Sequence, residues 1–386
     1  MALVSKIMSL LGESQYGLSP SGQSPVPSLA LPLWSYLPYD SYDPETGLFH
    51  NVSSSGFVLE ATPIAGASLS DQDKLDKFFT KEGHLPEGCS VQFLLYGSPR
   101  IESRLQYWQR YRLDANTNQR YKDLAKRRYA YLQQKAFDKE HPVRDFKVLI
   151  SYTMPDLVLS SLETEDLLRT RESLIRSFEK IGLHAKPMTD QRLIQEVRNI
   201  LNYEQTTTDD AFWYSPHESI AKQIVSRDLD ARVEKDGVYL RNKAYVAHSY
   251  LPKKSPKKWA LGHMDKLFGG VLNRGETIPC AFLLHYGFTV CRDQNLQKKK
   301  AASKREALEV TLKNPLSKWQ PNIQDEFQEA REVVDAVQQG ERIIDACLSL
   351  TTFCETSELE SVKSTVESLW TDHMWAAESA TYNHLN

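Results

Sequence analysis

Two lysine-rich clusters contain the residues whose types and spacing are best suited to binding chemistry. The first cluster consists of Lys253, Lys254, Lys257, Lys258 and Trp259, set around two prolines. The second consists of Lys298, Lys299, Lys300, Lys304 and Arg305, within one helical stretch. Cations beside an aromatic ring can hold a phosphate backbone and stack a base. Anionic lipid headgroups or an acidic partner use the same side chains, and such runs are also typical of solvated helix faces.

Motifs for catalysis are incomplete in this chain. A phosphate-binding loop of the form G-x-x-x-x-G-K-[ST] needs Gly followed by Lys, and no glycine here precedes a lysine. The pair His217-Glu218 begins H-E-x-x-H, but Ala221 stands where the second zinc ligand belongs, so we interpret the pair as a helix start after Pro216. The runs VVD at 333–335 and IID at 343–345 resemble a Walker B motif, but there is no phosphate site for their Asp to serve, so we interpret them as a helix face and a half-buried strand. We therefore expect no catalytic residue, no bound cofactor and no metal site in this chain.

The composition indicates a folded, water-soluble protein whose charges produce no strong long-range electrostatic field. Hydrophobic residues make up 41% and charged residues 25% of the 386 residues, with a net charge of −3. A nearly neutral chain is not drawn as a whole to nucleic acid or to an anionic membrane, so such contacts must be local. The five cysteines form no C-x-x-C pair, which indicates neither a disulfide framework nor a zinc knuckle. No apolar run approaches the ~18–20 residues that cross a bilayer.

Strand and helix signals alternate after a loop-like N-terminus. Residues 1–33 are rich in Gly, Pro and Ser and predict a flexible arm. From residue 34, β-favouring runs bounded by Gly or Pro alternate with amphipathic stretches. The predicted strands are 57–62, 91–96, 146–152, 245–251, 278–290 and 342–354. The predicted helices are 70–81, 101–113, 118–138, 163–181, 257–268, 293–313, 321–339 and 357–370.

This alternation predicts a mixed α/β (α+β) fold of layered strand-helix modules, built as two split βαβ-like units with additional helices and without a P-loop domain. We place the first module, with a helical insertion, at 34–205 and the second at 206–386. No internal sequence repeat is strong enough to prove a duplication. Because a final strand and helix usually call for one more strand, the end at TYNHLN suggests a separated domain of a longer protein or a shortened reading frame.

Five segments in order resemble the TraC family of F-type conjugation systems. They are YDPETGLFHNVSSSGFVLEA within 39–62, LPEGCSVQFLLYGSPRI at 85–101, WQRYR through LAKRRYAYL up to 132, FWYSPHESIAKQIVSRDLDARVEKDGVYL at 212–240, and RNKAYVAHSYLPKKSPKKWALGHMDKLFGG at 241–270. Proteins of this family are assembly ATPases of bacterial type IV secretion. The resemblance is to the N-terminal, non-motor part, so no catalytic residue carries over.

The resemblance implies a docking and assembly domain for pilus assembly and DNA transfer, an interaction scaffold in the bacterial cytoplasm at the periphery of the inner membrane. It implies inner-membrane secretion components as partners, an ATPase domain in cis or in trans, and a homo-oligomer for the full-length protein. ATP and Mg are expected only for the missing C-terminal half. Two alternatives stay open: a nucleic-acid-binding module that uses the lysine clusters, which the acidic balance disfavours, and an unrelated hydrolase.

Overall fold

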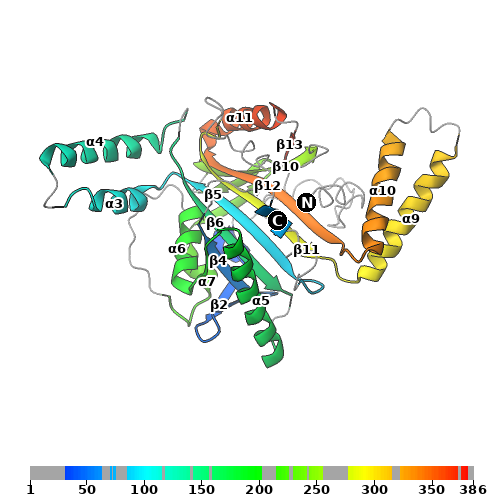
Figure 1. The fold of residues 1–386 in the computed structure, drawn as a ribbon. Coiled ribbons are helices and arrows are strands. Elements are labelled where there is room, and N and C mark those ends of the chain that lie inside the picture. Colours follow the sequence, from blue (N-terminus) through cyan, green and yellow to red (C-terminus); the bar gives the residue numbers. More distant parts are fainter. Residues whose placement is uncertain are drawn as a thin grey trace.

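The computed structural model describes residues 31–62, 70–71, 73–74, 85–114, 118–139, 142–155, 159–201, 214–225, 229–240, 243–254, 277–314, 322–372 and 375–380. Within these ranges, strands and helices alternate over much of the chain as the sequence predicts, but three strands follow one another directly at 39–61 and again at 230–254. The fold is mixed α/β, with one sheet at its centre (Figure 1).

The sheet contains 13 strands, and every pairing in it is antiparallel. The strands are β1 (Leu31–Pro32), β2 (Tyr39–Asp43), β3 (Leu48–Asn51), β4 (Ser55–Ala61), β5 (Ser90–Ser98), β6 (Asp145–Met154), β7 (Ala185–Pro187), β8 (Asp230–Glu234), β9 (Gly237–Leu240), β10 (Tyr245–Lys254), β11 (Ala281–Val290), β12 (Ile344–Glu355) and β13 (Ala376–Ser379). The helices are η1 (Leu33–Tyr36), α3 (Glu102–Arg110), α4 (Gln119–Lys135), α5 (Ser161–Lys180), α6 (Asp190–Leu201), α7 (Ile220–Ile224), α9 (Gln294–Leu312), α10 (Asn322–Gln338), η3 (Thr356–Glu358) and α11 (Leu359–Asp372).

The strand order repeats between the two halves of the sheet. One half runs β2-β3-β4-β6-β5 and the other runs β8-β9-β10-β12-β11. The halves meet where β5 pairs with β11, with Tyr286 opposite Phe93 and Leu284 opposite Leu95. Because this central pair is antiparallel, a two-fold rotation about an axis through it exchanges the halves. The fold is thus an internal duplication in topology, which the sequence alone does not reveal.

Each half contains a split βαβ unit, as predicted. In the first, β6, α5 and β7 follow one another along the chain while β4 lies between the two strands and pairs with both. In the second, β12, α11 and β13 follow one another with β10 between the strands. Two strands that are each antiparallel to the same central strand are parallel to each other, so each unit is a crossover with one strand inserted.

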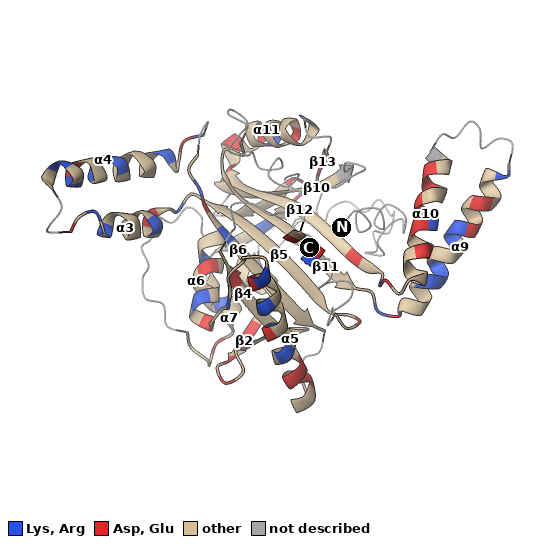
Figure 2. Cartoon of the chain, in the orientation of Figure 1, with Lys and Arg blue, Asp and Glu red and all other residues tan. Residues whose placement is uncertain are grey.

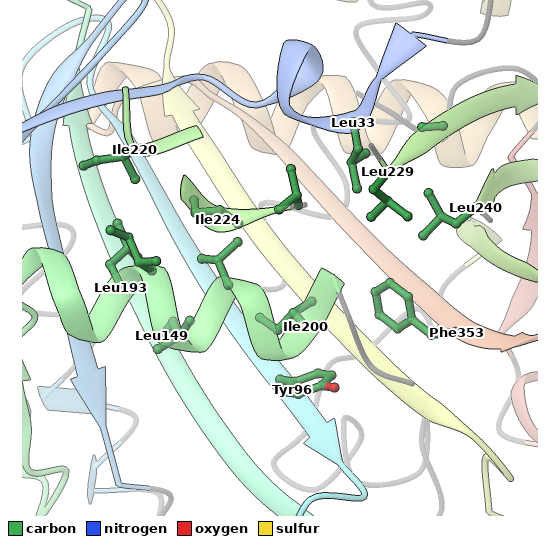
Figure 3. Close-up of a cluster of buried hydrophobic side chains, with 14 of the residues drawn as sticks. Leu33, Tyr96, Leu149, Leu193, Ile200, Ile220, Ile224, Leu229, Leu240 and Phe353 are labelled. Carbon is green, nitrogen blue, oxygen red and sulfur yellow. The ribbon is translucent and has the colours of Figure 1, made fainter. Parts of the chain in front are cut away.

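Apolar side chains alternate along the strands and supply a core on each face of the sheet. On one face, α5 covers the first half through Leu174 and Phe178, and α11 covers the second through Val366 and Trp370. The opposite face is covered by α6, α7 and η1. Figure 3 shows that the cluster on this face joins both halves, because Tyr96, Leu149 and Ile200 pack with Leu240 and Phe353, among others. The two halves therefore share one core.

Each half also carries a helical hairpin between equivalent strands. The α3–α4 pair connects β5 to β6, and the α9–α10 pair connects β11 to β12. Both pairs project from the sheet, at opposite ends of the molecule (Figure 1). We call residues 102–139 the basic arm and residues 294–338 the second arm.

Most predicted elements are confirmed. The strands expected at 57–62, 91–96, 146–152 and 245–251 are β4, β5, β6 and β10, and the helix expected at 163–181 is α5, which ends before Gly182 at φ 82°. One expectation was wrong: α11 is followed by β13, so the second unit does gain its closing strand. The sequence patterns also missed β2, β3, β7, β8, β9 and α6.

Several predictions fall wholly or partly outside the described residues. These include the helix at 257–268, most of the helix at 70–81, and all but the last three residues of the arm at 1–33. Those three residues belong to β1 and η1, and Leu33 is buried. The predicted module boundary at 205/206 lies in the undescribed range 202–213 and stays a prediction.

Candidate docking interface on the helical arms

The basic arm is fixed to the body at its base. Ile101, Leu105 and Ala136 form a small buried cluster there. The side chain of Asn118 accepts a hydrogen bond from the Arg120 backbone at 2.9 Å and so caps the start of α4. Lys139, just beyond α4, forms an ion pair with Glu358 of η3, which belongs to the second half. The arm is therefore held at one end and extends away from the sheet.

The outer part of the basic arm has little core of its own. Leu105 is the buried residue of α3, and Ala125 is that of α4. Ten large apolar or aromatic side chains are exposed among the described residues, and six of them lie on this arm: Tyr107, Tyr111, Tyr121, Leu124, Tyr131 and Phe137. Such a concentration of exposed apolar surface is typical of an interaction site.

The exposed groups on α4 follow the helix period. Tyr121, Leu124 and Tyr131 are spaced by three and seven residues, which places them along one side of the helix. Arg128 lies on the same line, and its guanidinium carbon is 5.9 Å from the centre of the Trp108 ring. Arg112 approaches that ring to 4.3 Å. The arm thus presents a stripe of aromatic and aliphatic groups combined with stacked arginines.

Charge distinguishes this arm from the rest of the chain. Residues 102–139 contain ten Lys or Arg and four Asp or Glu, a formal net charge of +6, so the remaining residues carry −9. Figure 2 shows blue segments along α3 and α4. Arg110, Arg120 and Arg127 are exposed. A locally basic, aromatic surface can therefore recognise an acidic partner, although the whole molecule is slightly acidic.

The second arm holds one of the two predicted lysine clusters. Lys298, Lys299, Lys300, Lys304 and Arg305 all lie on α9, as the sequence predicts. Lys299 and Lys300 are exposed, whereas Lys304 and Arg305 are half-buried. Burial lowers the pKa of the Lys304 ammonium, while Glu326 and Glu329 of α10 act in the opposite direction.

The helix α10 is the acidic complement of α9. It contains five Asp or Glu and one Arg, a net charge of −4, and Figure 2 shows it as a red-marked helix beside the blue-marked α9. The second arm also has its own core, built around Ala330, Val333 and Val334. Part of the positive charge predicted to contact a partner is thus opposed by the neighbouring helix.

The other predicted cluster is described only in part. Lys253 and Lys254 are the last two residues of β10, where Lys254 is paired in register with Ala376 of β13. Their side chains, and all of Lys257, Lys258 and Trp259, lie outside the described residues. The structure therefore does not bring the two predicted clusters together.

A groove of about 1680 Å³ lies at the base of the basic arm. Its lining includes Lys147 and Arg192, which contact the buried Glu196 carboxylate at 2.6 and 2.8 Å. Arg192 also donates to both oxygens of Glu60, at 2.6 and 2.9 Å. The bond from Arg192 holds the pKa of the Glu60 carboxyl below its ordinary value. This network ties α6 to β4 and β6, which is a structural task.

The incomplete catalytic motifs have the structural roles expected of them. His217 and Glu218 are exposed in the turn before α7. In VVD, Val333 and Val334 are buried on α10 while Asp335 is exposed. In IID, Ile343 is buried before β12 and Asp345 is exposed on that strand. The interpretation as a helix face and a half-buried strand is confirmed.

The basic arm was not singled out from the sequence as a binding site. The signal was present, because WQRYR and LAKRRYAYL combine arginine, lysine and aromatic residues at short spacing. Taken as sequence, those segments indicate only the family resemblance. Periodicity alone does not tell a buried aromatic stripe from an exposed one, so the exposure of this arm needed the structure.

Comparison with known proteins identifies the family to which this chain belongs. The family model described as "TraC protein" matches residues 33–386. A curated relative named "Protein TraC", from Escherichia coli (strain K12), is 26% identical over 340 residues, which are 83% of this chain and 38% of the relative. The chain belongs to the TraC protein family, and it spans well under half the length of that relative.

Among the residues that the structure describes, no helix combines the length and the apolar character needed to cross a bilayer.

Proposed function

We propose that this chain is a docking and assembly scaffold of a conjugative type IV secretion system, active in pilus assembly and DNA transfer. Membership in the TraC family supports the role in conjugative secretion. The scaffold positions an ATPase domain at the inner membrane and contacts secretion components there. That ATPase domain is supplied in cis or in trans, because no glycine of this chain is followed by the lysine that a phosphate-binding loop needs.

The observation that carries the proposal is the exposed basic arm. An arm with six exposed large side chains and a net charge of +6 has a surface to which a partner can bind. The arm is anchored to both halves of the body, through the Arg104–Asp145 pair with β6 and the Lys139–Glu358 pair with η3. A partner bound to the arm is therefore held at a defined position relative to the shared core.

A nucleic-acid-binding role is the second candidate, and one observation favours it. Trp108 with two arginines near its ring resembles the combination that stacks bases and holds phosphates. The net charge of −9 outside the arm opposes this role, because a long polyanion that binds along the arm also approaches the acidic body and is repelled by it. We therefore expect only weak, sequence-independent DNA affinity, on the order of 10⁻⁴–10⁻⁶ M at physiological salt.

Membrane co-sedimentation tests the scaffold. The full chain is mixed with membranes that contain the conjugation apparatus and with membranes that lack it. We expect the wild type to sediment only with the former. Reversing Arg110, Arg120 and Arg127 to Glu should reduce the bound fraction at least about tenfold, whereas reversing Arg176, Lys180 and Lys186, exposed on α5 and β7, should not. The same assay tests the other predicted cluster, with Lys253, Lys254, Lys257 and Lys258 changed to Glu.

Circular dichroism of each variant serves as the folding control, since exposed charges seldom change stability by more than ~0.5 kcal/mol each. Single-stranded DNA is titrated against the same proteins. Nanomolar DNA affinity that disappears in the arm variant, together with unchanged membrane binding, would replace the scaffold with the nucleic-acid-binding role.

A further inference from the structure

Two free cysteines lie opposite each other on neighbouring parts of the sheet, although the whole second arm separates them in the chain. Ala281 is paired with Phe353 in the register of β11 and β12, which places Cys280, just before β11, opposite Cys354. Cys354 belongs to the buried cluster that α11 covers, and Cys280 packs against the same cluster. The two thiols are therefore on one face of the sheet.

The hydrogen-bond pattern of the sheet brings this pair close together. The backbone N–H of Thr356 donates to the carbonyl of Ala244 at 3.0 Å. Bonding directions alternate along an antiparallel strand, so Cys354, two residues earlier, also directs its N–H and carbonyl toward β10. Toward β11 it is then in a non-hydrogen-bonded position, where opposite Cα atoms are about 4.5 Å apart. A disulfide joins Cα atoms that are about 4.4–6.8 Å apart, so this pair can be bridged.

Small molecules can reach the pair, because Cys280 and Cys354 both line the groove of about 1680 Å³ at the base of the basic arm. Burial raises the pKa of both thiols, and the neighbouring Cys354 raises the pKa of Cys280 further, an effect that depends on the two sulfurs lying close together. The Arg144 guanidinium acts in the opposite direction on Cys280. Both cysteines are therefore protonated thiols at neutral pH, and the more exposed one has a cation beside it.

We propose that Cys280 and Cys354 are a thiol–disulfide site, which closes to a cross-strand disulfide on reaction with a low-molecular-weight disulfide such as oxidised glutathione. The deprotonated Cys280 sulfur attacks one sulfur of the oxidant, and the other sulfur leaves as a thiolate. The Cys354 sulfur then attacks the Cys280 sulfur, forms the internal disulfide and expels the second thiolate. The protons of the two cysteines pass to the two released thiolates, so one disulfide is reduced for each one that forms.

The closed disulfide ties together the two ends of the segment that carries the second arm. Residues 281–353 contain β11, α9, α10 and nearly all of β12. Cross-linking the ends of so long a loop restricts the unfolded chain more than the folded one. We expect the oxidised protein to have a thermal unfolding midpoint at least about 3 °C above that of the reduced protein.

Peptide mapping of the full chain tests the proposal. Reduced protein is incubated with excess oxidised glutathione until the exposed Cys347 carries glutathione, and it is then alkylated and digested with trypsin without reductant. The wild type should yield peptides 275–292 and 343–363 joined by a disulfide, and a dithiol reductant should separate them. Because these peptides also contain Cys291 and Cys347, fragmentation of the joined pair must place the bond at Cys280 and Cys354.

Single variants give an independent assignment of the bond. Cys280→Ala and Cys354→Ala should each lose the joined peptides and the rise in unfolding midpoint. Cys347→Ala is the matched control and should keep both, because Cys347 lies on the same strand as Cys354 but opposite Gly287. Circular dichroism checks the fold of each variant.

The inference would be overturned by a wild type in which Cys347 carries glutathione while Cys280 and Cys354 stay reduced. A bond that fragmentation places at Cys291 or Cys347 would overturn it as well. Both results are read from the wild type, so they hold even where a variant fails to fold.

Discussion

Glu196 has the least exposed side chain among the ion pairs of the described residues, at 1%. Its contacts with Lys147 and Arg192 connect to Glu60 through the two bonds that Arg192 donates. Buried carboxylates are retained in proteins when such bonds satisfy them. These charged residues therefore stabilise the fold, and Glu60, Lys147 and Arg192 among them line the groove beneath the basic arm.

The pH dependence of the Glu60 contact follows from the direction of its pKa shift. The folded-state pKa lies below the ordinary value of 4.5 because Arg192 donates to the carboxylate. A group with a lowered folded pKa contributes stability above its unfolded pKa and loses it as the pH falls through the folded one. We expect Glu60→Gln to lower the free energy of unfolding at about pH 7 by at most about 1 kcal/mol.

That difference between wild type and Glu60→Gln should shrink as the pH falls through the folded-state pKa, which lies below 4.5, and vanish once Glu60 is protonated in both states. Urea unfolding at pH values above and below this range measures it. Glu45→Gln is the matched control, because Glu45 is exposed. An equal difference at both pH values would show that the effect of Glu60 does not arise from its charge.

At the scale of elements, the two hairpins should differ in local stability. Opening free energy depends on buried apolar contacts. The second arm has a core that includes Ala301, Val333 and Val334, whereas the outer basic arm has Ala125 alone as a buried residue of α4. We expect the amides of α4 to exchange with solvent at least about tenfold faster than those of α10 in dilute protein at high salt. Hydrogen exchange with mass spectrometry measures this, and equal protection of both helices would contradict it.

The sequence predicts the long, strongly patterned elements well. In β12, Ala346 and Leu350 are buried and Asp345 is exposed, as the alternation from Ile344 indicates. Gly182 ends α5 with a positive φ, the expected C′ position. The capping box of α5, between Ser160 and Glu163, begins the helix before the predicted start at 163.

The short strands could not be predicted in the same way. Strands such as β7 and β13 contain three and four residues and obtain their pairing from β4 and β10, which are distant in the chain. No local pattern encodes such a contact. The internal duplication cannot be recognised from the sequence for the same reason, because it lies in the order in which the strands pair. The basic arm was missed as a site because exposure of Tyr121 or Tyr131 is a tertiary property.

At the scale of the whole molecule, the two hairpins at opposite ends of one continuous sheet differ in charge: the basic arm has a net charge of +6, whereas the second arm contains eight Lys or Arg against seven Asp or Glu. The core joins both halves through Tyr96, Leu149, Leu240 and Phe353, so the arms are held on one body (Figure 3). A net charge of −3 conceals +6 on one arm and −9 elsewhere. Such separation orients an incoming partner before contact. The architecture therefore suits a protein that positions others.

The central claim is that the basic arm docks on the conjugation apparatus. Its most direct test is hydrogen exchange of the α4 amides in the full chain, at high dilution, with membranes that carry the apparatus and with membranes from cells that lack it. The account predicts at least about tenfold slower exchange of α4 with the former alone, and no change in the variant with Arg110, Arg120 and Arg127 reversed to Glu. Unchanged exchange of α4 on membranes that nevertheless retain the protein would contradict it.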